Sequence, residues 1–194
     1  MVYLLIGGIL LLIVAPIIRI LPSRRQKEQM ALRRTASSNG LTVELTHIDD
    51  PDPDPEKYLS NTGRPLPRVM AVIAYRKPVK KPAEWRRIPA VDWCVVRRQG
   101  GKATGLPEGW DWDVPLPAHA NTKLASFVVG ALTTLPDDAV KVEERSWIVS
   151  VYWNERGGVE GLNAIIDFSK TVSDIEASVV IADTDNDPSD DDRS

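Results

Sequence analysis

The chain has 194 residues and a mass of 21.5 kDa, enough for one ordinary domain and an attachment segment. Its composition, 43% hydrophobic and 26% charged, excludes a disordered or fibrous protein. The single cysteine, Cys94, excludes an intramolecular disulfide and a cysteine-rich zinc site, and we expect it to pack in the core. The two histidines, His47 and His119, do not have zinc-protease spacing. No metal site, cofactor or catalytic motif is therefore predicted.

Residues 1–21 are almost entirely apolar, and Arg19 is their one charged residue. A helix of about 20 residues spans about 30 Å, the thickness of the membrane hydrocarbon. We therefore expect residues 1–21 to form a single transmembrane anchor. A cleaved signal peptide is the alternative, but its basic residues would precede the apolar run, whereas here they follow it.

Basic residues gather directly after the apolar run, with Glu28 as the only acidic residue among them. They are Arg19, Arg24, Arg25, Lys27, Arg33 and Arg34. The positive-inside rule then predicts a cytoplasmic C-terminal domain and an N terminus on the outer side of the membrane. We expect residues 22–40 to form a basic juxtamembrane helix whose cations lie on anionic lipid. A solvated stalk is the alternative.

Residues 41–182 are predicted to form a cytosolic α+β domain with a mostly antiparallel sheet and two packed helices. Alternating or continuous apolar runs predict strands over 41–48, 68–75, 91–97 and 146–153. Apolar residues at helical spacing predict helices over 121–135 and 159–175. From Asp183 onward six aspartates and no apolar pattern predict a disordered acidic tail, residues 183–194.

The segment from Asp49 to Pro55 alternates aspartate with proline. Proline in alternation prevents both a helix and a sheet ladder, so we expect an extended, solvated loop. A calcium loop is the alternative, but the glycine turn and the closing glutamate that it needs are missing.

Two tryptophans stand in a Gly/Pro-rich stretch, GLPEGWDWD, over residues 105–113. Rigid aromatic side chains on loops are typical contact anchors, so Trp110 and Trp112, with Asp111 and Asp113 beside them, are predicted to bind a partner. The alternative is a lid folded back over the sheet. A second hypothesis makes Asp111, Asp113 or His119 the acid/base group of an enzyme that acts on a lipid or envelope precursor.

The charge is divided along the chain. The first 102 residues contain 18 Lys and Arg against 9 Asp and Glu, and the remaining residues contain 6 against 18. The basic part could face the membrane, an acidic partner, its own acidic half or RNA. Nucleic-acid binding would use Arg86, Arg87, Arg97 and Arg98, but no RNA-binding module or stacking platform accompanies them, and it is not favoured.

Residues 20–29, ILPSRRQKEQ, continue into Met30–Leu32 and then into Gly40–Val43 at the start of a predicted strand. This stretch resembles the YajC family, small accessory subunits of the bacterial Sec preprotein translocase. The resemblance covers about the first 45 residues. The body of this chain is longer than that family's, and the family's Gly-Gly strand turn is absent at the expected place.

The resemblance implies a single-pass inner-membrane accessory or assembly protein without enzymatic activity. Its expected partners are the lipid bilayer and a membrane protein complex, the Sec preprotein translocase. It also implies a bacterial inner-membrane location with a periplasmic N terminus. The fold class that the strand and helix patterns predict is α+β, with one N-terminal transmembrane helix ahead of the cytosolic domain.

Overall fold

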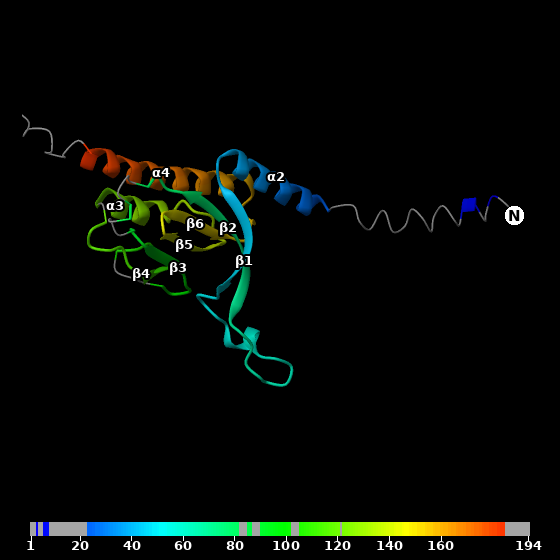
Figure 1. Cartoon of the computed structure of the whole chain (residues 1–194). Helices are drawn as coiled ribbons and strands as arrows, with labels where there is room; N and C mark the ends of the chain where they lie inside the picture. The colour runs from blue at the N-terminus through cyan, green and yellow to red at the C-terminus, as the bar shows by residue number, and fades with distance from the viewer. Residues whose placement is uncertain are drawn as a thin grey trace, which may run out of the picture.

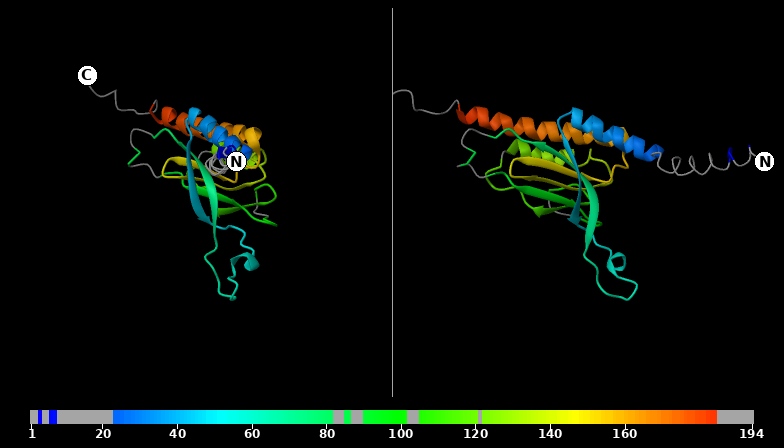
Figure 2. Two further views of the ribbon diagram at one scale, coloured as in Figure 1. Left: turned by 90° about the vertical axis from the view of Figure 1, so that its right-hand side faces the viewer. Right: turned by 45° about the vertical axis from the view of Figure 1, so that its right-hand side comes forward.

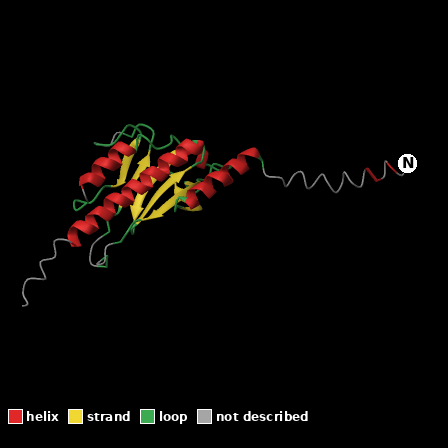
Figure 3. Cartoon of the chain, turned by 90° about the horizontal axis from the view of Figure 1, so that it is seen from above, coloured by secondary structure: helices red, strands yellow, loops and turns green. Residues whose placement is uncertain are grey.

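A computed structural model describes residues 3, 6–7, 23–81, 85–86, 90–101, 105–120 and 122–184, the last eight of these as backbone only. Within this part of the chain, six strands form one sheet and three helices lie together on one of its faces (Figures 1 and 3). The helices are α2 (Arg24–Ser38), α3 (Thr122–Ala131) and α4 (Gly158–Thr184).

The strands are β1 (Thr42–Asp49), β2 (Val69–Pro78), β3 (Trp93–Arg97), β4 (Trp110–Val114), β5 (Ala139–Arg145) and β6 (Ile148–Trp153). Their order in the sheet is β1-β2-β6-β5-β3-β4, and every neighbouring pair is antiparallel. The sheet thus consists of three hairpins, and the last hairpin in the sequence, β5–β6, lies in the centre. Its turn places Ser146 and Trp147 at φ of 52° and 66°, the positive values that a two-residue type I′ hairpin turn requires.

The main core fills the space between the sheet and the helices. Strands contribute Tyr75, Trp93, Trp110 and Trp153 to it, and helices contribute Leu124, Leu162 and Phe168, all at most 2% exposed. Each such large apolar side chain stabilises the fold by about 1.5–3 kcal/mol relative to an exposed position.

Helix α2 packs on this core. Ser23 and Gln26 form a capping box at its N terminus, and Leu32 and Ala36 are buried. Arg33 donates from Nε and Nη2 to the two carboxylate oxygens of Glu155, each at 2.8 Å. The hydroxyl of Tyr75 also donates to Glu155, at 2.8 Å. These contacts make α2 part of the folded domain.

The predicted fold class is therefore wrong in two respects. Three helices, not two, pack on the sheet, because α2 also buries Leu32 and Ala36 in the main core. No helix among the described residues is long and apolar enough to cross a membrane, since α2 is rich in charge and α4 carries acidic and basic residues throughout. The anchor prediction falls on residues 1–21, which lie outside the described residues except for positions 3, 6 and 7.

The four predicted strands and the two predicted helices of the body are confirmed, with shifted ends. Strand β5 was not predicted, and residues 110–114 form strand β4 where a loop was expected. Helix α4 continues to Thr184, past the predicted start of the acidic tail. Residues 185–194 lie outside the described residues.

Candidate functional site

The face of the sheet opposite the helices is not covered by any described helix (Figures 1 and 3). Because side chains alternate along a strand, every second residue points to this open face. A small apolar cluster of Val72, Ala74 and Tyr152 forms part of it, with Ile48 and Met70 packed alongside. The remaining side chains on this face are mostly charged. The open face is therefore a polar surface that surrounds a small apolar cluster.

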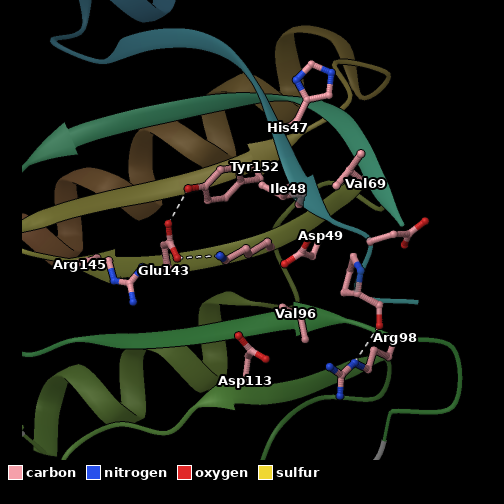
Figure 4. Close-up of a pocket in the computed structure, with 13 residues that line it drawn as sticks. His47, Ile48, Asp49, Val69, Val96, Arg98, Asp113, Glu143, Arg145 and Tyr152 are labelled. Atoms are coloured by element: carbon pink, nitrogen blue, oxygen red, sulfur yellow. Dashed lines mark hydrogen bonds and ion pairs between the residues drawn. The ribbon is translucent and has the colours of Figure 1, made fainter. Parts of the chain in front are cut away.

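A pocket of about 470 Å³ is hollowed into the open face (Figure 4). Residues from all six strands line it: His47, Ile48 and Asp49 of β1, Val69 of β2, Val96 of β3, Asp113 of β4, Lys141, Glu143 and Arg145 of β5, and Tyr152 of β6. Arg98, just after β3, lines it as well. This volume lies within the range of ordinary ligand sites.

The segment between β1 and β2, residues 50–68, projects away from the helices as an arm (Figures 1 and 2). Its base is fixed at the pocket. Arg98 donates from Nε to the carbonyl oxygen of Pro51 at 2.9 Å, and the amide of Gln99 donates to Asp52 Oδ2 at 2.9 Å. Strands β1 and β3 are separated by three other strands, so these two contacts join distant parts of the sheet at one end of the pocket.

One wall of the pocket is a preformed polar network. Tyr152 donates its hydroxyl proton to Glu143 Oε1, and Lys141 pairs with Glu143 Oε2 at 2.8 Å. Burial raises the pKa of Glu143, but the hydrogen bonds from Lys141 and Tyr152 outweigh it, and the pKa ends below its ordinary value. Burial and the bond to Glu143 raise the pKa of Tyr152. At neutral pH the carboxylate is therefore charged and the phenol neutral.

The other polar groups give the pocket both signs of charge. Arg145 and Asp49 are exposed at its rim, and Arg98 and Asp113 face it from the opposite side (Figure 4). No group of three His, Cys, Asp or Glu residues that could hold a metal ion occurs in the described part of the chain.

Cys94 lies beneath this face and is 4% exposed. Burial, partly offset by the nearby charge of Lys141, raises the pKa of its thiol to about 12. The thiol is therefore protonated at neutral pH, and the prediction of a packed cysteine is confirmed.

Strand β4 separates the four residues of the predicted partner-binding site, because alternate residues of a strand face opposite sides of the sheet. Trp110 is 1% exposed and belongs to the core, with the guanidinium of Arg97 4.6 Å above its ring. Trp112 is partly buried against the same core, and Asp111 lies beside Gly101. Of the four residues only Asp113 lines the pocket, and His119 does not line it either. Partner binding by Trp110, Trp112, Asp111 and Asp113 stays a prediction.

Helix α2 carries most of the basic residues that were predicted to lie on lipid, so the structure shows where they lie. Arg24 is 95% exposed and pairs with Glu28 at 3.2 Å, and Arg25, Lys27 and Arg34 are exposed. Arg33 instead turns inward to Glu155, and Arg19 lies outside the described residues. Contact of the exposed cations with lipid stays a prediction.

Sequence reasoning missed most of the pocket: Arg98, Lys141, Glu143, Arg145 and Tyr152. A signal was present in the strand that was overlooked, because Lys141, Glu143 and Arg145 recur at every second position. Such a run of charges indicates a strand with one polar face.

Comparison of the chain with models of protein families, with curated protein sequences and with solved structures found no match. The resemblance of residues 20–43 to the YajC family therefore stays a prediction.

Proposed function

We propose that this chain is a non-enzymatic recognition domain that binds a short extended segment of a partner protein in the pocket on the open face of the sheet. The pocket itself carries the proposal. It is large enough for several side chains, and its polar groups are positioned by internal contacts. A preorganised site loses less conformational entropy when a ligand binds.

The composition of the pocket favours a polypeptide. Arg98 and Arg145 offer positive charge, and Asp49 and Asp113 offer negative charge around apolar side chains such as Val96. A peptide segment can supply both charge signs, amide groups and apolar side chains in one ligand. A nucleic acid would instead be matched by a surface with an excess of cations.

The protonation states favour binding over acid/base catalysis. A general acid or base works best with a pKa near the operating pH. Here the pKa of Glu143 is lowered, that of Tyr152 is raised, and that of Cys94 is raised to about 12. These three groups therefore keep one protonation state through the neutral range.

The partner is proposed from the resemblance alone. It would be a membrane protein complex, with the Sec preprotein translocase as the first candidate. In this role the domain would act as an accessory or assembly subunit.

The test is a selection of random peptides of about 12 residues displayed on phage, followed by affinity measurements on the selected peptides. Charge reversal at the exposed rim, as Arg145→Glu or Asp49→Lys, should weaken the selected peptides at least about tenfold. Lys80→Glu, at an exposed position outside the pocket, is the matched control and should leave affinity unchanged. Circular dichroism would verify that each variant is folded. Equal affinity for wild type and both rim variants would refute the proposal.

A further inference from the structure

Two carboxyl groups are buried on the helix-covered side of the sheet. Glu144 of β5 is 1% exposed, and Glu176 of α4 is 6% exposed. The two groups interact electrostatically, and like charges in such a setting repel. Glu176 lies on α4 four residues beyond the core residue Val172 and directly after Ile175, which also packs on the core.

The surroundings of this pair contain little to compensate a negative charge. Trp93 of β3 donates from Nε1 to Glu144 Oε2 at 3.0 Å, but Glu144 Oε1 is buried without a hydrogen-bond partner among the described residues. Asp92, just before β3, adds a further negative charge, and the residue opposite Glu144 on β6 is the apolar Val149. Among the described residues no cation acts on Glu144 or Glu176.

Two buried carboxylates without a cation are unstable in the charged form, because burial removes the water that solvates them. Burial and the charge of Glu176 raise the pKa of Glu144 to about 8, and burial raises the pKa of Glu176. The packed arrangement of β5 and α4 therefore favours the protonated form of this pair. Protonation would also give Glu144 Oε1 a hydrogen to donate.

We propose that Glu144 and Glu176 form a proton-dependent switch that holds the C-terminal part of α4 on the sheet. Loss of the protons places two like charges in the core, and the least costly relief is to move Glu176 into water. Glu176 follows Val172 and Ile175, which pack on the main core, so that movement loosens the helix from about residue 173 onward and leaves the core residues up to Val172 in place.

Hydrogen exchange of the full chain, measured by mass spectrometry at about pH 6 and about pH 9, tests the switch. After correction for the intrinsic exchange rates, protection of the amides in 173–184 should fall at least about tenfold at the higher pH. Protection of the strands should change much less.

Three variants make the result decisive. Glu176→Gln keeps the shape of the side chain but cannot ionise, so the pH dependence over 173–184 should disappear. Glu144→Gln leaves Glu176 able to ionise but removes the like charge beside it, so the loss of protection should become smaller. Glu160→Gln, an exposed carboxyl in the first turn of the same helix, should behave as wild type. The proposal is overturned if wild-type protection over 173–184 is the same at both pH values, or if Glu176→Gln retains the wild-type loss.

Discussion

Glu143 and Glu144 are consecutive residues of β5 whose carboxyl groups lie on opposite faces of the sheet and have opposite pKa shifts. Glu143 faces the pocket, where Lys141 and Tyr152 hold its pKa below the ordinary value. Glu144 faces α4, where burial raises its pKa to about 8. A shift of β5 by one residue would exchange their surroundings. The pair therefore helps to fix the register of the central hairpin.

This arrangement predicts a stability maximum on the acid side of neutrality. The folded pKa of Glu144 lies above its ordinary 4.5, so its contribution is present below pH 4.5 and is lost as the pH rises towards 8. The folded pKa of Glu143 lies below 4.5, so its contribution is present above pH 4.5 and is lost as the pH falls. The free energy of unfolding, measured by urea titration at stepped pH, should decrease on both sides.

Substitutions can show which residue causes the decrease in unfolding free energy at low pH and which causes it at high pH. Glu144→Gln should reduce the decrease between about pH 5 and 8 by about 3 kcal/mol. A smaller decrease should remain from Glu176, because burial raises its pKa as well. Glu143→Gln should flatten only the acid side. A Glu144→Gln protein with the wild-type alkaline decrease would show that other groups cause it.

The attachment of α2 rests on the ion pair between Arg33 and Glu155. Glu155 has no exposed side-chain surface, so Arg33→Ala leaves a buried carboxylate without its cation. We expect a loss of about 2 kcal/mol, less than for a fully buried pair because the side chain of Arg33 is 40% exposed. Urea unfolding would measure the loss. Arg34→Ala, at an exposed neighbour on the same helix, should change stability by less than about 0.5 kcal/mol.

Two helical glycines should respond to alanine in opposite directions. A Cβ at Gly161 of α4 would lie 2.9 Å from Trp153 Cζ2 and 3.2 Å from Pro136 Cβ, both rigid groups, so Gly161→Ala should destabilise by about 1–3 kcal/mol. A Cβ at Gly130 of α3 would meet nothing within 4 Å, so Gly130→Ala should stabilise by about 0.5–1 kcal/mol through helix propensity. Thermal unfolding of both variants provides the comparison, and a stabilised Gly161→Ala protein would contradict the close packing of α4 on Trp153.

The thiol of Cys94 should be unreactive in the folded protein. It is 4% exposed and its pKa is raised to about 12, so little thiolate exists at pH 8 and reagents cannot reach it. Labelling with a chromogenic disulfide reagent should be slower than in the denatured chain by a factor of about a thousand or more. Rapid labelling under native conditions would mean that the sheet opens locally at β3.

Hydrophobic patterning was sufficient to predict the elements of the main core. Leu124 and Val128, or Val149 and Val151, recur at the spacing of a helix or a strand because the core requires apolar residues there. The same rule failed for β5, where Lys141, Glu143 and Arg145 face the pocket and Glu144 is a charged residue on the buried side. It also failed for β4, since the flanking glycines and prolines favour a loop and conceal the alternation of Trp110 to Asp113.

The pocket could not be predicted because it depends on strand order. Asp49, Arg98 and Arg145 come from three hairpins, and only the position of β5–β6 between the other two brings them together. The docking of α2 was missed for a similar reason. The basic residues of α2 suggested a lipid surface. Nothing near Arg33 in the sequence indicates that it pairs with Glu155, which lies just before α4.

The central place of the last hairpin has a consequence during synthesis on the ribosome. The β1–β2 and β3–β4 hairpins are made first, yet neither pairs with the other, because β6 and β5 must come between them. Until Trp153 has left the exit tunnel, the inner edges of β2 and β3 have no strand to bind. The apolar run Val69–Tyr75 is then an unpaired edge of the kind that favours aggregation. We therefore expect the nascent chain to be most prone to aggregation between the emergence of β2 and that of β6.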